Sequence, residues 1–147
     1  MTRIDFAFGA PDRLQMACDV ARKHYLSGRS LIVYSGDADI LARFDHLLWS
    51  FDATAFVPHV TAGDPLAAHT PVWLTANAPQ PPANAAQTAW LLNLDQQCPP
   101  GIEHFERALE IVSDQPEDKQ AARQRWRQYQ ADGHTLHAHD VSGRQMP

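Results

Sequence analysis

The first apolar residues of the chain follow strand-like and then helix-like spacing. In "RIDFAF" an apolar side chain recurs at every second position, which predicts a strand over residues 3–8 with one buried face. Between Pro11 and Gly28 the apolar side chains instead lie three and four residues apart. This spacing predicts an amphipathic helix that begins near the proline and ends at the glycine.

The same order repeats immediately downstream. "SLIVYS" predicts a short buried strand over residues 31–34, and "GDAD" supplies Asp37 or Asp39 as the N-cap of a second helix. The apolar face of that helix carries Ile40, Leu41, Phe44, Leu47 and Leu48. The order strand, helix, strand, helix predicts a parallel sheet with right-handed crossovers.

The middle of the chain contains three short strand candidates, over residues 54–59, 71–76 and 88–95. Between the last two lies "NAPQPPANAAQ", whose prolines and low apolar content predict a surface loop over residues 77–87. The stretch "GIEHFERALEIVSD" then changes from helical spacing to alternation, which predicts a short helix running into a strand.

A long helix from Pro116 to about Ala131 and an alternating strand over residues 134–141 complete the pattern. We therefore expect one α/β domain over residues 1–141, with three layers and a mostly parallel central sheet. The polar ending "SGRQMP", residues 142–147, is predicted to be a frayed tail.

Composition disfavours a DNA-duplex-binding, a membrane-spanning and a secreted protein. The 147 residues are 44% hydrophobic and carry a formal charge of -5, which disfavours non-specific binding of double-stranded DNA. No apolar run approaches the ~18 residues of a membrane span, and we expect no signal peptide, because "MTRIDFAFGA" is too short and too polar for its apolar region. Cys18 and Cys98 have no partners at metal-ligand spacing, so we expect two reduced cysteines in a cytoplasmic protein.

Motifs for catalysis or cofactor binding are weak. The turns "FGAPD" and "YSGDAD" each hold one glycine, which disfavours a nucleotide site at either turn. His134, His137 and His139 could bind zinc, but a structural site normally needs four ligands, and exposed histidines on an edge strand explain them better. We expect no enzyme and no cofactor; the alternative is a nucleotide- or metal-dependent hydrolase on the same scaffold.

The last helix has an unusual face in "DKQAARQRWRQYQADG". At ~100° per residue, Lys119, Arg123, Trp126 and Arg127 fall within one arc of the helix. One interpretation is a solvated basic face. The other is a socket for an anionic peptide with an apolar end, in which arginines bind carboxylates and the indole packs an apolar side chain. A third interpretation is a surface that binds single-stranded nucleic acid directly, and it predicts affinity for a bare oligonucleotide.

A second unusual stretch, "LLWSFDATAFVPHV", places large apolar residues where the second helix ends. Such residues serve either the chain's own core or a partner. Phe51 and Val57 remain ambiguous between these two, whereas Trp49 and Phe56, beside Pro58, are assigned to a hydrophobic patch that faces a partner.

These stretches together resemble the chi subunit of bacterial DNA polymerase III, a clamp-loader accessory protein. The resemblance runs through "A.DVARKHYLSGRSLIVYS", "ADILARFDHLLWSFDATAFVPHV", the following "AGDP", "EIVSD" and "KQAARQRWRQYQADG". It implies a Rossmann-like fold without a nucleotide site and a non-catalytic adaptor of the polymerase III holoenzyme.

The resemblance also implies two partners. One is the psi subunit of the clamp loader, whose interface corresponds to Trp49 and Phe56, with Val57 and Pro58 adjoining; an accessory helicase is implied at the same surface. The other is the acidic C-terminal tail of single-stranded DNA-binding protein. Its pocket corresponds to Val112, Lys119, Arg123, Trp126 and Arg127. Trp126 stands where tyrosine is usual and Arg127 where lysine also occurs, so the chemical types are kept.

Overall fold

The computed structural model describes residues 2–50, 57–62, 64–66, 70–81 and 89–141. The predicted tail and most of the predicted 77–87 loop therefore lie outside the described residues, as do Phe51 and Phe56.

The described residues form a seven-stranded sheet in the order β3-β4-β2-β5-β6-β1-β7, and every neighbouring pair is parallel. In chain order the elements are β1 (Arg3–Ala10), α1 (Arg13–Leu26), β2 (Leu31–Tyr34), α2 (Ala38–Ser50), β3 (His59–Thr61), β4 (Val72–Thr75), β5 (Trp90–Asn93), the 3₁₀ turn η2 (Ile102–His104), β6 (Arg107–Ser113), α3 (Pro116–Ala131) and β7 (Thr135–Asp140). The predicted α/β fold class is confirmed.

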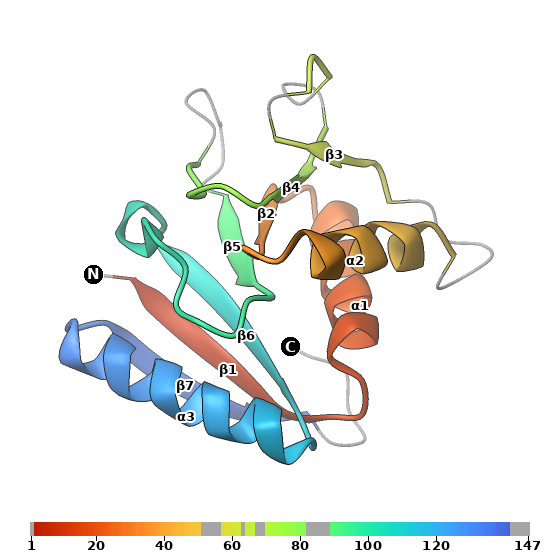
Figure 1. The fold of residues 1–147 in the computed structure, drawn as a ribbon. Coiled ribbons are helices and arrows are strands. Elements are labelled where there is room, and N and C mark those ends of the chain that lie inside the picture. Colours follow the sequence, from red (N-terminus) through yellow and green to blue (C-terminus); the bar gives the residue numbers. More distant parts are fainter. Residues whose placement is uncertain (1, 51–56, 63, 67–69, 82–88, 142–147) are drawn as a thin grey trace.

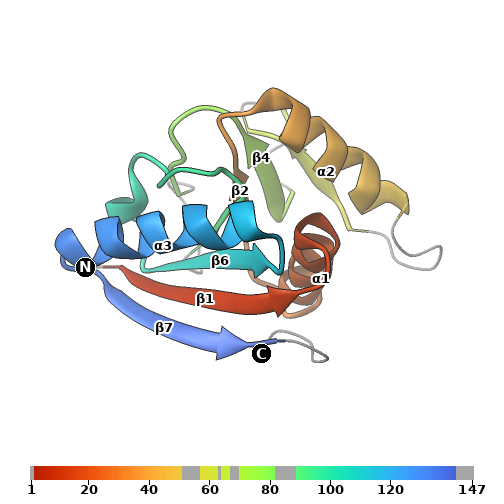
Figure 2. The ribbon, with the colours of Figure 1, turned by 60° about the horizontal axis from the view of Figure 1, so that its bottom comes forward.

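The helices cover both faces of the sheet (Figure 1 and Figure 2). Helices α1 and α2 pack against each other and, with one face of the sheet, enclose a core that includes Phe44 and Leu92. Helix α3 covers the opposite face beside β6 and β7, over a second core that includes Phe6 and Tyr129. These three layers match the sequence expectation.

Strand β1 was predicted to have one buried face, but both of its faces are buried. Ile4 and Phe6 belong to the core under α3, whereas Ala7 belongs to the core under α1. The reason is that β1 lies inside the sheet, between β6 and β7, so helices cover both of its faces. Gly9, at φ 84°, is the extra residue of a bulge between Phe8 and Ala10, and this conformation favours glycine.

Most predicted boundaries agree with the structure, and one does not. Asp12 caps α1 by accepting a hydrogen bond from the Gln15 amide, and Asp37 accepts one from the Asp39 amide at the start of α2. Residues 54–56 of the strand predicted over residues 54–59 lie outside the described residues; Val57 and Pro58 are not part of a strand, and β3 begins at His59. Pro58 has no amide hydrogen to donate to a neighbouring strand, which explains why pairing starts after it.

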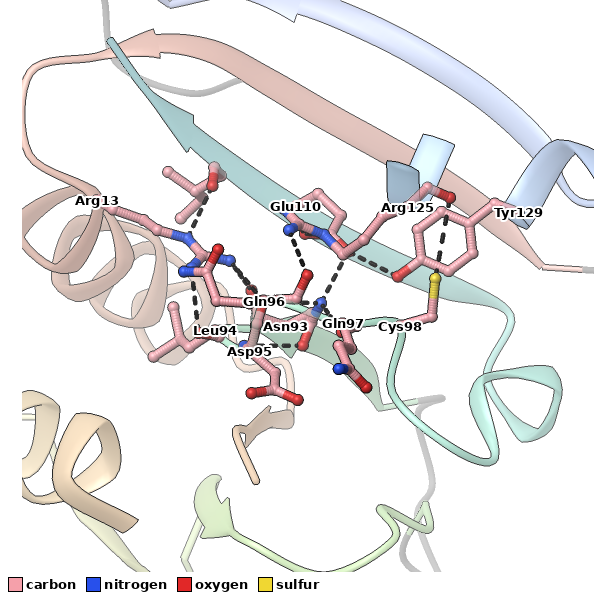
Figure 3. A network of polar contacts seen from close by, with 11 residues as sticks. Arg13, Asn93, Leu94, Asp95, Gln96, Gln97, Cys98, Glu110, Arg125 and Tyr129 are labelled. Carbon is pink, nitrogen blue, oxygen red and sulfur yellow. Dashed lines mark hydrogen bonds and ion pairs between the residues drawn. The ribbon is translucent and has the colours of Figure 1, made fainter. Parts of the chain in front are cut away.

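A buried ion pair joins α3 to the sheet (Figure 3). The Arg125 guanidinium lies 3.0 Å from the Glu110 carboxylate of β6, and their side chains are 3% and 0% exposed. Tyr129 Oη and Asn93 Nδ2 donate to the same carboxylate at 2.6 and 2.9 Å. Arg125 also donates to the carbonyl of Gln96 at 3.0 Å. Both charges are thus fully hydrogen-bonded, as burial requires.

We predict strong coupling between the two charges. Arg125→Met should lower the free energy of unfolding by about 3–5 kcal/mol, because it leaves a buried carboxylate without its counter-ion. In a Glu110→Gln background the same substitution should cost much less, since the glutamine is uncharged. Urea unfolding of the four proteins measures this cycle, with Arg123→Met as an exposed control on the same helix. If the losses of unfolding free energy in the two single variants add up to the loss in the double variant, the predicted coupling is wrong.

His24 is a second buried polar group, near the end of α1. Its side chain is edge-on to Trp90, with ring centroids 4.8 Å apart. Burial, and to a smaller extent the positive charges of Arg29 and Arg107, lower the pKa of His24 to about 4. The folded protein therefore holds this imidazole neutral.

This burial predicts a pH dependence of stability. The unfolded chain protonates His24 near pH 6.5 and the folded chain only near pH 4. Between these values the unfolded state binds more protons, so stability should fall as the pH falls, by up to about 1.4 kcal/mol per pH unit. His24→Leu should reduce that slope, whereas the exposed His46→Leu control should keep it. Unfolding titrations from pH 7 to 4 that show the same slope for wild type and His24→Leu would refute this assignment.

Candidate functional site

A pocket of about 300 Å³ opens on the α3 face of the sheet. Its walls come from α3 and from the strands β1 and β7 beside it. The lining residues are Phe8, Ala122, Arg123, Trp126, Arg127 and Ala138. The pocket therefore combines an apolar floor with two cationic side chains.

The floor is held in place by aromatic packing. The half-buried Trp126 ring lies 5.0 Å from the Phe6 ring and 6.5 Å from the Phe8 ring, measured between centroids. One turn away on either side, Ala122 and Tyr129 are buried against the sheet. Because its neighbours are core residues, the indole presents a fixed apolar surface to the pocket.

The rim is positively charged. Arg123 and Arg127 are exposed and lie one helical turn apart, and Lys119 is exposed one turn earlier. Within the described part of the chain, no carboxylate forms an ion pair with either arginine. Two guanidinium groups at an apolar hollow can bind a carboxylate and leave the hollow for an attached apolar group.

The structure brings together three of the five residues predicted for this pocket, namely Arg123, Trp126 and Arg127. Lys119 lies on the same helix but does not line the pocket. Val112 does not line the pocket, because its side chain is 1% exposed and belongs to the core under α3; its role in binding the peptide stays a prediction.

Sequence reasoning missed Phe8 and Ala138 as pocket residues. Both were recognised as positions in alternating strands. Only the sheet order, which sets β1 beside β7 under α3, brings their side chains to one hollow.

A second surface feature lies at the end of α2. The Trp49 side chain is 51% exposed, and its ring centroid lies 4.6 Å from that of His59. The His59 ring is fixed from both sides: Nδ1 lies 2.8 Å from the Val57 carbonyl and Nε2 lies 2.5 Å from the Asp45 carboxylate. Both partners are acceptors, so both hydrogen bonds form together only when the ring carries two protons.

The predicted patch around Trp49 is only partly described. Val57, which the sequence left ambiguous between core and interface, is 1% exposed and packs in the core under α1 and α2. Pro58 is half-buried next to β3. Phe56, the second predicted anchor, lies outside the described residues. Trp49 is thus the described aromatic that a partner could contact.

The three histidines near the C-terminal strand have separate surroundings. His134 Nδ1 accepts a hydrogen bond from the Thr2 amide at 3.2 Å, and His139 Nε2 lies 2.9 Å from the Asp5 carboxylate. His137 is exposed on β7, and β7 is an edge strand as predicted. Among the described residues, no three histidine, cysteine, aspartate or glutamate side chains gather in a geometry that could hold a metal ion.

Arg13 occupies the carboxyl ends of the central strands, the place where open α/β sheets commonly bind ligands. Its guanidinium donates to the carbonyls of Ile111, Leu94 and Asp95 at 2.9, 3.1 and 3.0 Å (Figure 3). The chain's own arginine therefore donates hydrogen bonds to these three carbonyl oxygens at the strand ends.

Comparison with known proteins identifies the family. A family model described as DNA polymerase III chi subunit, HolC, matches residues 1–137. A Pseudomonas aeruginosa protein named DNA polymerase III subunit chi is 34% identical over 143 residues, which cover 95% of this chain and 96% of that protein. The chain belongs to the DNA polymerase III chi subunit family.

Two further chi subunits are similar to this chain. The Haemophilus influenzae protein is 26% identical over 130 residues, covering 86% of each chain. The Escherichia coli protein is 27% identical over 122 residues, covering 83% of this chain and 81% of that one. The role of this chi-family chain is therefore that of an accessory subunit in DNA replication.

The chi family match includes all of α3 and α2 but ends at residue 137, one residue before the pocket residue Ala138. In the part of this chi protein that the structure describes, no helix has the length and apolar character needed to cross a membrane.

Proposed function

We propose that this chi-family protein is a non-catalytic adaptor with two docking surfaces. One binds the acidic C-terminal tail of single-stranded DNA-binding protein, and the other binds the psi subunit of the clamp loader. The observation that carries the proposal is the apolar pocket on α3 with two cationic side chains on its rim. Its chemistry fits a peptide that ends in aspartates and an apolar residue.

The arginine rim and the indole floor divide the recognition between them. Arg123 and Arg127 are exposed and can each form paired hydrogen bonds to a carboxylate. The hollow of about 300 Å³ between Trp126, Phe8 and Ala138 accommodates a single apolar side chain. The net charge of -5 on the whole chain disfavours non-specific binding of nucleic acid, and the local cationic rim supplies the positive charge that an acidic segment needs.

The psi subunit docks at Trp49 in this proposal. A half-exposed tryptophan that packs at a tilt against a fixed imidazole is a preorganised anchor, and tryptophan is enriched among interface hot spots. An accessory helicase that used the same surface would compete with psi.

The two surfaces lie at opposite ends of the sheet. Trp49 contacts His59, the first residue of the edge strand β3, whereas Ala138 belongs to β7, the other edge strand. Five strands separate these edges, so a short peptide in the pocket leaves the Trp49 surface accessible. We therefore propose that both partners bind at the same time, as bridging requires.

We predict that Arg123 contributes strongly to peptide binding. Arg123→Ala should weaken binding by about tenfold or more, because a charge-assisted hydrogen bond contributes about 1.5–3 kcal/mol. Arg123→Lys should recover only part of the loss, since an ammonium cannot form the paired contact. Fluorescence anisotropy with a labelled peptide that ends in aspartates and a phenylalanine measures the affinities.

The controls distinguish binding at this pocket from a general loss of positive charge on the protein. Arg43→Ala removes an exposed arginine from α2 and should leave the affinity unchanged. An amidated peptide should bind more weakly than the free acid, with a smaller difference in Arg123→Ala. If Arg123→Ala binds as tightly as wild type, or a bare oligonucleotide competes with the peptide, the pocket assignment is wrong.

A separate prediction concerns Trp49. Trp49→Ala should reduce psi binding by at least about 2 kcal/mol, the usual size of a hot-spot loss. The thermal unfolding temperature should change little, because the side chain is half exposed in the isolated chain. Calorimetric titration with psi measures the binding. Leu26→Ala removes another exposed large apolar side chain, on α1, and serves as the control. A large stability loss with unchanged binding would place Trp49 in the core.

A further inference from the structure

A second and larger pocket, of about 430 Å³, lies on the opposite face of the sheet from the α3 pocket. It is bounded by the C-terminal half of α1 and by β5, β6, β1 and β7. The two pockets share β7 as a wall: Ala138 lines the α3 pocket and its neighbour His139 lines this one. Successive residues of a strand face opposite sides, so the two sites are separate.

The lining is strongly cationic in an otherwise acidic chain. Four basic side chains line the pocket, namely Arg3, Lys23, Arg29 and Arg107, against the single carboxylate of Asp5. This local excess contrasts with the net charge of -5 for the whole chain. A cleft with one sign of charge and apolar walls concentrates ligands of the opposite sign.

Asp5 forms ion pairs with Arg3 and Arg107, and its single negative charge offsets only part of the positive charge of the pocket. Burial alone would raise the pKa of this carboxyl group, yet hydrogen bonds from His139, Arg107 and Arg3 hold its pKa below the usual value. Arg107 Nε donates to Asp5 at 2.8 Å and His139 Nε2 lies 2.9 Å from it. Asp5 orients these groups and remains 1% exposed beneath them.

Arg29 and Arg107 converge on one indole. Their guanidinium carbons lie 4.5 and 4.1 Å from the centroid of the Trp90 ring. Within the described residues Arg29 forms no ion pair with a carboxylate. The indole thus fixes the direction of two guanidinium groups while leaving hydrogen-bond donors of Arg29 for a ligand.

Burial, and in part the same positive charges, lower the pKa of His24. It is 5% exposed and lines the pocket, and its Nδ1 has no hydrogen-bond partner among the described residues. Burial first, and then the charges of Arg29 and Arg107, lower its pKa to about 4. The apolar side chains of Val20, Leu26 and Leu109 complete the lining.

We propose that this pocket binds a phosphate monoester attached to an organic body, such as a nucleoside 5′-monophosphate or the 5′-phosphorylated end of a DNA strand. A phosphate monoester carries close to two negative charges at neutral pH and three acceptor oxygens. It therefore matches clustered guanidinium groups better than a carboxylate with one charge. The apolar wall and the volume accommodate the attached sugar and base.

The test uses the indole N–H signals of the full-length ¹⁵N-labelled protein, in which Trp90→Phe assigns the Trp90 signal. The probes are inorganic phosphate, thymidine 5′-monophosphate, thymidine, and short thymidine oligomers with and without a 5′-phosphate. We expect saturable movement of the Trp90 signal with phosphate and the monophosphate, and none with thymidine. The oligomer pair then decides whether a free nucleotide or a strand end is bound.

Arg29→Gln should weaken binding of the monophosphate by about tenfold, and Arg29→Lys should do so by less. Arg43→Gln removes the same charge from an exposed position on α2 and should leave the affinity unchanged. The proposal is overturned if thymidine binds as tightly as its monophosphate, if phosphate leaves the Trp90 signal in place, or if Arg29→Gln and Arg43→Gln have equal effects. None of these outcomes bears on peptide binding at α3.

Discussion

The buried pair of Glu110 and Arg125 is the interaction on which the α3 surface depends. A helix that follows a parallel strand could pack on the sheet in several rotations about its axis. Arg125 must point to the one carboxylate that neutralises it, because both groups are almost completely buried. At ~100° per residue, that constraint places Trp126 at the flank of the helix and turns Arg123 and Arg127 outward. The pocket chemistry thus follows from a charge pair that does not line the pocket.

The parallel sheet separates the proposed binding surfaces. Successive residues of a strand face opposite sides of the sheet, so a single strand contributes to two independent hollows, as Ala138 and His139 do on the edge strand β7. The Trp49 surface lies at the far edge, beside β3. A chain of modest length can in this way present three chemically different surfaces: a half-exposed tryptophan, a cationic rim around an apolar hollow, and a cationic pocket. Arg13 meanwhile occupies the carbonyls at the strand ends, where related folds commonly bind nucleotides.

Local sequence signals predicted much of the fold. The bounds of α3 and β2 follow from a proline, a glycine and β-branched residues, which act over a few positions. Local signals did not predict which side chains are buried by elements far away in the sequence. The alternation in β1 predicted one buried face, whereas its position between β6 and β7 buries both faces. Val57 and Val112 have apolar side chains that pack in two different cores, and no local pattern reveals which core each side chain enters. Glu110 is another example, since a carboxylate in an alternating strand gives no sign of a buried arginine 15 residues later.

The most direct test of the two-surface account is a titration of the ¹⁵N-labelled protein with the acidic tail peptide, followed by its tryptophan indole signals. The described residues include Trp49, Trp73, Trp90 and Trp126, one in each of four separate environments. The account predicts that the Trp126 signal moves with saturation while the Trp49 signal stays in place, and that Trp49 then moves on addition of psi without reversing the first change. Movement of Trp49 with the peptide, or loss of the Trp126 shift when psi binds, would contradict it.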